Sequence, residues 1–349
     1  MNSSPFDKIK SMKRWQFWIG VLISAAFLFF AMRGLDLGEF WMAISTAQYL
    51  WLIPGIIVYF AAVWIRAWRW NYLLRSTKSI STSKTFPITC IGYMGNNIYP
   101  ARAGEVLRAV MLKRKEGVPV STSLATIIVE RIFDGVVMLA FVFLNPSELN
   151  RLTGSSGFIG NIRDIAYVGA GVFIIALVTF FFAAIFPKRT LSLSHRLIER
   201  IPNESMREKI TKVTEKFLNG LDSLRSPRDM FMIFFASLLI WLLETVKYWF
   251  VMHAFNFRVT FFTLMLLNGI ANLVTTIPSA PGYVGTWEAV TKAVLMAYRV
   301  PGPEAFGYAV VLHIALYVPI TLLGAFFLAR EGIKWNESLR SETILTTRI

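Results

Sequence analysis

The sequence has little of what disulfide-linked proteins and metalloproteins depend on. It contains one cysteine and three histidines among 349 residues, and only 16% of its residues are charged. The lone Cys90 excludes an intramolecular disulfide and a cysteine metal cluster, and the scattered histidines lack zinc-ligand spacing. Soluble globular chains carry about 25% charged residues. The shortage of charge therefore argues against a soluble fold.

Hydrophobic residues, in contrast, make up 55% of the chain. A transmembrane helix needs about 20 mostly apolar residues, and six runs qualify: 15–32, 49–65, 120–144, 166–186, 230–252 and 305–329. Two further segments, 86–100 and 261–298, are apolar but interrupted by Gly, Pro and Asn. The first run lacks a small-residue cleavage site, so we expect a retained span rather than a signal peptide.

Basic residues are concentrated between these runs. The chain has 36 Lys and Arg against 21 Asp and Glu, a net charge of +15. Segments 66–86, 101–119 and 187–229 are basic, whereas 33–49 and 145–165 are nearly balanced. Because cytoplasmic loops are enriched in Lys and Arg, we predict a multi-pass protein of the cytoplasmic (inner) membrane with both termini cytoplasmic. Basic residues placed between apolar runs do not indicate a nucleic-acid partner.

This orientation divides the chain into a cytoplasmic segment 1–14, a transmembrane domain 15–330 and a cytoplasmic tail 331–349. Within the domain, 187–229 reads as a basic amphipathic connection, which either lies on the membrane surface or packs against the ends of the bundle. Segment 86–100 begins and ends in the cytoplasm, so we expect a re-entrant hairpin. Segment 261–298 either re-enters from outside or crosses twice.

The two interrupted segments resemble each other. Each has Asn before a Pro-x-x-x-Gly turn, at Pro100 and Gly104 in the first and at Pro278 and Gly282 in the second, and each is followed by a Glu. Broken segments in corresponding positions of two inverted halves indicate a transporter binding site. We therefore predict an all-α integral membrane protein, a polytopic helical bundle of about seven to eight spans with two broken or re-entrant hairpins and an inverted repeat. The alternative is that Pro and Gly only kink two ordinary spans.

Charged residues within apolar segments are costly and usually functional. Glu130, Arg131 and Asp134 share one helix, and Arg102, Glu105 and Arg108 follow the first turn at three-residue spacing. A surplus of arginine suits a phosphate headgroup, since its planar fork binds phosphate in a bidentate manner.

Other polar residues have simpler interpretations. We interpret Glu244 and Lys247 as a self-neutralising pair. Arg66 and Arg69 lie among tryptophans, which is typical of interfacial anchors. His313 is expected to be a packed or hydrogen-bonded histidine rather than a proton carrier.

Three ordered motifs resemble a known family, the lysylphosphatidylglycerol synthase transmembrane region of flippase-like membrane proteins. They are Asn97-x-x-Pro100-x-Arg102-x-Gly104-Glu105-x-x-Arg108, Glu130-Arg131-x-x-Asp134 and Pro278-x-x-Pro281-Gly282-x-x-Gly285-x-x-Glu288. The resemblance covers about residues 15–330 and implies a lipid-translocating module. In the synthases a cytoplasmic catalytic domain follows this region. Only about 20 residues follow the last predicted span here, so lysyl transfer is not expected.

We therefore expect a flippase-like transporter for an anionic or phosphate-bearing lipid, not an enzyme, with no cofactor and no metal. The alternatives are a membrane-embedded lipid-modifying transferase and a non-catalytic partner of lipid-synthesis enzymes. The predicted substrate-binding residues are Asn97, Pro100, Arg102, Gly104, Glu105, Arg108, Glu130, Arg131, Asp134, Pro278, Pro281, Gly282, Gly285 and Glu288.

Overall fold

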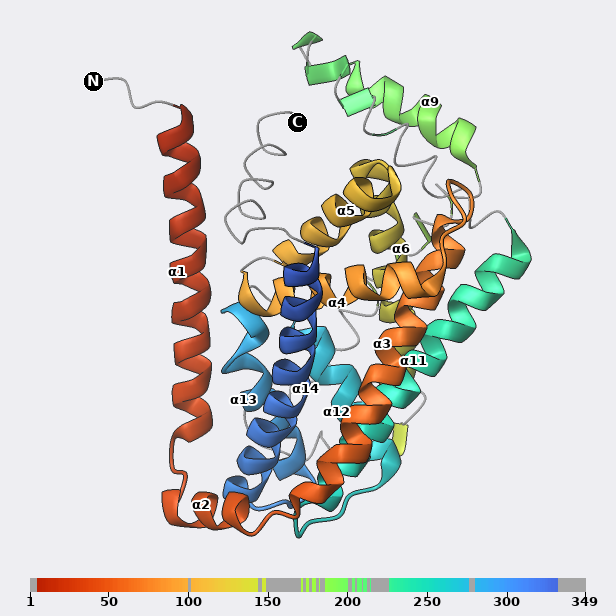
Figure 1. Cartoon of the computed structure of the whole chain (residues 1–349). Coiled ribbons are helices and arrows are strands. Elements are labelled where there is room, and N and C mark those ends of the chain that lie inside the picture. Colours follow the sequence, from red (N-terminus) through yellow and green to blue (C-terminus); the bar gives the residue numbers. More distant parts are fainter. Residues whose placement is uncertain are drawn as a thin grey trace.

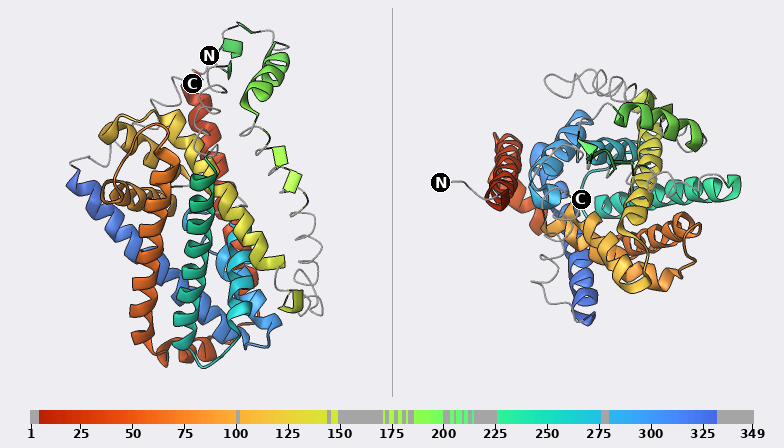
Figure 2. Two further views of the ribbon diagram at one scale, coloured as in Figure 1. Left: turned by 90° about the vertical axis from the view of Figure 1, so that its right-hand side faces the viewer. Right: turned by 90° about the horizontal axis from the view of Figure 1, so that it is seen from above.

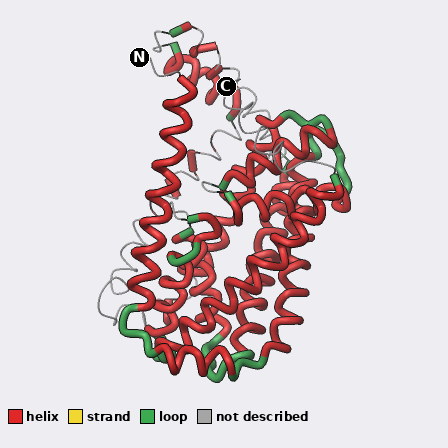
Figure 3. Tube along the Cα trace, turned by 60° about the vertical axis from the view of Figure 1, so that its left-hand side comes forward, coloured by secondary structure: helices red, strands yellow, loops and turns green. Residues whose placement is uncertain are grey.

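The computed structural model describes residues 5–99, 102–143, 146–148, 226–275 and 280–331, with separate short stretches between 171 and 214, and describes side chains from Trp18 onward. All regular elements in these ranges are helical (Figure 3). In chain order they are α1 (Pro5–Met32), α2 (Leu37–Ser45), η1 (Tyr49–Trp51), α3 (Leu52–Leu74), α4 (Thr82–Ile98), α5 (Ala103–Glu116), α6 (Val120–Phe143), α9 (Pro187–Ile198), α11 (Pro227–His253), α12 (Phe261–Val274), η4 (Pro281–Tyr283), α13 (Thr286–Ala297) and α14 (Gly302–Arg330).

Three stretches are long and apolar enough to cross a membrane: Tyr49–Leu74, α11 and α14. Residues Trp18–Met32 of α1 and helix α2 make a fourth if the two are counted as one span, which is bent by 93°. Helix α6 is 24 residues long but carries Glu130, Arg131 and Asp134. The predicted run 166–186 and the later part of the 187–229 connection fall mostly outside the described residues. The count of seven to eight spans and the inverted repeat therefore stay predictions.

Helix ends follow local sequence signals. Asp36 and Thr260 cap α2 and α12 by accepting backbone N–H groups with their side chains. Ser226 does the same for α11, and Pro227 follows at the first helical position. Helix α5 ends at Gly117, which has a φ of 74°.

Helices α3 and α11 form an antiparallel pair that organises the bundle (Figures 1 and 2). Gly55 near the start of α3 lies against Phe250 near the end of α11, and Arg75 after α3 reaches Asp229 at the start of α11. The segment 75–81 leads from the end of α3 into α4, and 254–260 leads from the end of α11 into α12. The two broken segments, α4–α5 and α12–η4–α13, therefore begin at opposite ends of this pair.

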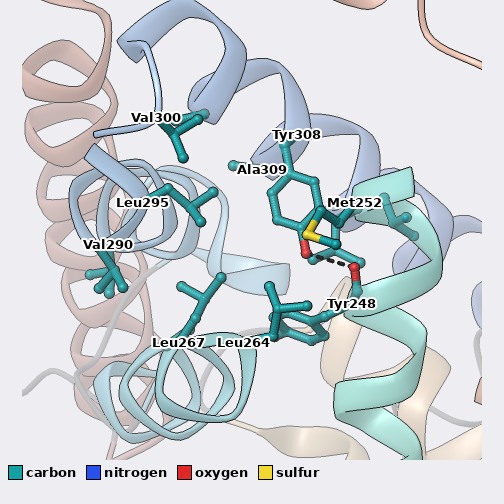
Figure 4. Close-up of a cluster of buried hydrophobic side chains, with 14 of the residues drawn as sticks. Tyr248, Met252, Leu264, Leu267, Val290, Leu295, Val300, Tyr308 and Ala309 are labelled. Carbon is teal, nitrogen blue, oxygen red and sulfur yellow. Dashed lines mark hydrogen bonds between the residues drawn. The ribbon is translucent and has the colours of Figure 1, made fainter. Parts of the chain in front are cut away.

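The largest apolar cluster lies where α11, α12, α13 and α14 meet (Figure 4). Leu264, Leu267 and Leu295 are fully buried there, and Tyr308 donates a hydrogen bond of 3.0 Å to the carbonyl of Tyr248. The outer surface is also apolar: Ile57, Phe231 and Leu322 are 64%, 64% and 65% exposed. Such a continuous apolar exterior suits contact with lipid acyl chains. The protein is a membrane-embedded, multi-pass helical bundle.

Candidate functional site

An ion pair between α3 and α6 lies at the centre of the site. Arg69 donates to the two carboxylate oxygens of Asp134, at 2.5 Å to Oδ1 and 3.3 Å to Oδ2. The indole N–H of Trp241 donates to the same Oδ1 at 3.0 Å, and Arg69 also donates to Ser237 Oγ at 2.6 Å. Arg69 and Asp134 are both 1% exposed. Each buried charge therefore depends on the other for compensation.

A second buried pair joins α5 to α6. Arg108 binds Glu130 in a bidentate manner, with N–O distances of 2.7 and 3.2 Å. Its guanidinium lies 3.6 Å from the ring centroid of Trp70, whose indole N–H is bound to Thr126. Arg69 Nη2 lies 3.9 Å from Glu130. The two pairs are thus parts of one cluster, which extends from α5 through α6 to α3.

The pair predicted between Glu244 and Lys247 forms on α11, but it is not isolated. Arg66 of α3 donates to Glu244 at 3.0 Å and lies 3.8 Å from Asp134. The prediction of Arg66 and Arg69 as interfacial anchors is wrong, because both are buried and face carboxylates on α6 and α11. The neighbouring tryptophans suggested an interface, but the pairing partners lie far away in the sequence.

At one edge of the cluster the residues are partly exposed: Arg102 and Glu105 lie at the start of α5, and Arg131 lies on α6. Arg131 Nε lies 3.0 Å from Glu105 and its Nη1 lies 3.7 Å from Asp134. Arg102 is 4.0 Å from Glu105. The side chains of Arg102, Glu105 and Arg131 are 31%, 21% and 33% exposed, whereas those of the two buried arginine–carboxylate pairs are at most 7% exposed.

The positive and negative charges of the connected groups are not equal in number. The cluster comprises six cations, Arg66, Arg69, Arg102, Arg108, Arg131 and Lys247, and four carboxylates, Glu105, Glu130, Asp134 and Glu244. With every group ionised, two positive charges are in excess. The most accessible cations of the cluster are Arg102 and Arg131.

Glycines allow α4 and α5 to pack at very short range. A Cβ built on Gly104 would lie 2.0 Å from the carbonyl oxygen of Gly92 and 2.3 Å from the backbone nitrogen of Asn96. The same close approach brings Gly95 against Gly104. The role of Gly104 is therefore backbone packing within the first broken segment, which fixes the direction in which α5 leaves the break.

The second break is shaped by glycines with left-handed backbone. Gly282 has a φ of 71° and lies under the ring of Tyr317, which a Cβ would approach to 2.4 Å. Gly285 has a φ of 88° and its N–H donates to Glu288 Oε2 at 2.6 Å. The carboxylate thus caps the start of α13, and its other oxygen contacts His313 of α14.

The two breaks lie against each other. Arg102 donates to the hydroxyl of Tyr283 at 3.0 Å and to the carbonyl of Thr275 at 3.3 Å. Nearby, Tyr317 of α14 donates to the carbonyl of Asn97 at 2.9 Å, and Asn97 donates to Thr321 at 2.8 Å. Residues from the two broken segments therefore meet at one place.

The structure describes most of the predicted site residues. Glu105, Arg108, Glu130, Arg131 and Asp134 lie in the ion cluster, and Arg102 joins this cluster to the second break. Pro281 begins η4. Gly282, Gly285 and Glu288 shape the second break and are not part of the two buried arginine–carboxylate pairs. Pro100 and Pro278 lie outside the described residues.

Five contributors were missed as site residues: Arg66, Arg69, Tyr283, His313 and Tyr317. Arg66 and Arg69 carried a usable signal, since two arginines three positions apart in an apolar run share a helix face and need partners. The aromatic residues carried no such signal. Within the described ranges, no three His, Cys, Asp or Glu side chains are grouped to hold a metal ion.

Comparison with known proteins adds a family relationship. A family model described as the lysylphosphatidylglycerol synthase TM region matches residues 17–324. A UPF0104 membrane protein of Methanothermobacter thermautotrophicus is 25% identical over 334 residues, covering 91% of this chain and 93% of that protein. A UPF0104 membrane protein of Pyrococcus horikoshii is 23% identical over 298 residues, covering 82% of this chain and 88% of that protein. Glycosyltransferase AglD of Haloferax volcanii is 25% identical over 302 residues, covering 78% of this chain but 48% of that protein.

Proposed function

Because this chain belongs to the lysylphosphatidylglycerol synthase transmembrane family, we propose that it moves an anionic or phosphate-bearing lipid between the leaflets of the cytoplasmic membrane. The observation that carries the proposal is the position of Arg102, which bonds across the two broken segments at the accessible edge of a cluster with two excess positive charges. Phosphate is the group that such a cluster would bind.

The geometry suggests how a headgroup would act. The guanidinium of Arg102 now donates to Tyr283 and Thr275, both neutral acceptors. A phosphate is a stronger acceptor for arginine than a hydroxyl or a carbonyl, because the bond is charge-assisted on both sides. Phosphate binding therefore releases Arg102 from Tyr283 and removes a contact between the two segments. Rocking of the two halves around the bound headgroup would then expose it to the other leaflet.

The buried part of the cluster has a different role. Arg69 with Asp134 and Arg108 with Glu130 hold α3, α5 and α6 together in a fixed arrangement. Their terminal nitrogens already donate to carboxylates, so these arginines position the accessible cations. Arg102 and Arg131 remain for the headgroup, with Glu105 between them to limit how tightly an anion is held.

A reconstitution experiment tests this function. Purified protein in vesicles would carry trace fluorescent phosphatidylglycerol, a polyprenyl phosphate or phosphatidylcholine, and a membrane-impermeant quencher would report leaflet exchange. We expect faster exchange of the two anionic lipids, whose phosphate carries no attached cation, than of zwitterionic phosphatidylcholine, and a loss of about tenfold or more with Arg102→Gln. The matched control is Arg75→Gln, since Arg75 is half exposed and its contacts among the described residues, with Asp229 and with the ring of Tyr72, lie outside the cluster. Exchange no faster than in empty vesicles for all these lipids would refute the proposal.

The match to AglD favours a second candidate, a role in glycosyl transfer on a lipid phosphate. That protein is named a glycosyltransferase, and the alignment covers 78% of this chain. Purified protein that modifies a lipid phosphate in a metal-dependent reaction, lost in Asp134→Ala, would favour an enzyme. Restored lipid glycosylation only when a synthesis enzyme is co-purified would favour a partner protein.

A further inference from the structure

Glu288 and His313 form a buried pair that the lipid-binding cluster does not use. Glu288 Oε2 accepts the Gly285 N–H at 2.6 Å, and Oε1 contacts His313 Nδ1. The two side chains are 7% and 13% exposed. One carboxylate therefore closes the second break and at the same time connects α13 to α14. Histidine is the side chain whose ordinary titration falls within the physiological range.

No other charged side chain among the described residues lies within ion-pair distance of Glu288 or His313. Lys292, four residues after Glu288, instead donates to the carbonyl of Ala31 on α1 at 2.5 Å. The segment Trp18–Met32 of α1, where side chains are described, and helix α12 contain no Asp, Glu, Lys, Arg or His.

The remaining titratable groups on the described elements packed against α13 and α14 are hydroxyl and thiol groups, the charges on α11 and α4, Glu39 on α2, and Arg66 and Arg69 on α3, which pair with carboxylates of the cluster. Tyr317 lies 5.8 Å from the His313 ring on α14, and Trp287 separates the pair from Tyr248 on α11. Tyr283 lies in the break itself. On α11, Glu244 and Lys247 pair with each other. Helix α4, which packs against α14, carries Tyr93, Cys90 and Lys84, and Lys84 is distant from the Glu288–His313 pair.

The pair is also next to the contact between the broken segments. One turn beyond His313, Tyr317 covers Gly282 and donates to the Asn97 carbonyl of the first segment. With His313 protonated, an ion pair holds α13 to α14. With His313 neutral, a hydrogen bond to the carboxylate is all that remains, and the attraction is weaker. Protonation of His313 thus changes the strength of the contact between Glu288 and His313. This contact lies one turn of α14 away from the hydrogen bond between Tyr317 and Asn97.

We propose that Glu288 and His313 form a proton-binding site that couples lipid movement to a transmembrane proton gradient. This inference rests on the proposed transport function and names its energy source. A proton enters from the acidic side, binds at the pair and leaves on the other side when the halves rock. On binding, the proton forms an N–H bond on the imidazole of His313, and this bond breaks when the proton leaves, so the cycle needs no oxidant, reductant or other co-reactant. The headgroup and the proton occupy different places, joined through Tyr317 and the break around Gly282.

The test is the steady-state distribution of the fluorescent anionic lipid across vesicles with a pH difference of about one unit. The membrane potential is clamped at zero with valinomycin and equal potassium on both sides. Coupling of one proton per lipid sets a limit of about tenfold between the leaflets. We expect an asymmetry approaching this limit for the wild type and equal leaflets for His313→Gln and for Glu288→Gln. The control is His253→Gln, since His253 Nδ1 donates to the carbonyl of Trp249 within α11, away from the breaks, and it should retain the asymmetry.

The outcomes separate the two proposals. Wild-type exchange that is fast but leaves the leaflets equal under the gradient overturns proton coupling and leaves lipid transport standing. If none of the lipids moves, transport fails, and the proton site is tested alone by NMR of histidine-labelled protein in nanodiscs. The resonance lost in His313→Gln should respond to pH, and this response should be displaced in Glu288→Gln. A resonance that does not respond to pH overturns the proposal.

Discussion

Arg102 and Tyr283 hydrogen-bond to each other at 3.0 Å, and both have left-handed backbone, with φ of 54° and 62°. The guanidinium also lies 5.8 Å from the tyrosine ring centroid. Positive φ is unfavourable for residues with a Cβ, and such residues are concentrated at functional sites where the surrounding structure holds them. Two of the three such residues that the structure describes are in contact here, one from each broken segment, so local strain is concentrated at this junction.

The first prediction separates strain from function at this junction. In Arg102→Gly the left-handed backbone becomes favourable, a gain of about 1–2 kcal/mol, while the hydrogen bonds to Tyr283 and Thr275 are lost, a comparable cost of about 1.5–3 kcal/mol. We therefore expect thermal stability in detergent close to that of the wild type and lipid exchange reduced about tenfold or more. Strong destabilisation together with lost exchange would instead mean that Arg102 is mainly structural. Arg299→Gly provides the control, since Arg299 also has positive φ, 63°, but is outside the junction.

The second prediction concerns the buried pair of Arg69 and Asp134. Removing one partner leaves an uncompensated buried charge, which costs about 3–5 kcal/mol. Asp134→Asn should therefore lower the free energy of unfolding by about this amount, measured by denaturant titration in detergent. Arg69→Gln combined with Asp134→Asn should cost less than the sum of the two single changes, because neither charge is then left alone. Additive costs would show that the pair is not coupled.

The sequence was sufficient to predict the helical membrane class and most of the clustered charges. Glu130, Arg131 and Asp134 were identifiable because ionised side chains in apolar helices need a reason to be there. The partners were not identifiable. Arg69 meets Asp134 across 65 positions and Arg102 meets Tyr283 across 181, and no local spacing encodes such contacts. Lys292 lies four positions after Glu288, at helical spacing, but helix packing brings His313 to Glu288 instead.

The third prediction concerns the crossing of α4 and α5. In Gly104→Ala the new methyl group would lie 2.0 Å from a backbone oxygen and 2.3 Å from a backbone nitrogen of α4, so the two helices must separate. We expect a loss of stability of about 1–3 kcal/mol or more and reduced exchange, because Arg102 and Arg108 are carried by the helix that moves. Gly302→Ala is the matched control, since its nearest atom is a flexible lysine carbon at 3.5 Å. Equal melting temperatures for Gly104→Ala and wild type would contradict the close packing.

The last prediction is a pH dependence at the end of α5, outside the membrane-spanning helices. Glu116 is bonded to Lys78 at 2.8 Å and to Lys84 at 3.0 Å, and these bonds hold the pKa of Glu116 below its ordinary value of 4.5. A carboxyl whose pKa is lowered by folding stabilises the folded state above its unfolded pKa, and this contribution is lost as the pH falls through the folded pKa.

Glu116→Gln should therefore lower the melting temperature in detergent at about pH 6, where an unfolded glutamate is fully ionised, and the difference from the wild type should shrink as the pH falls below 4.5. Both lysines are substantially exposed, so the effect should stay within about 1 kcal/mol and weaken in high salt. Glu304→Gln is the comparison, because Glu304 accepts a single backbone N–H from Asn256 and pairs with no lysine that the structure describes. A difference between Glu116→Gln and wild type that is unchanged by salt and by acid would show that these ion pairs do not stabilise the fold.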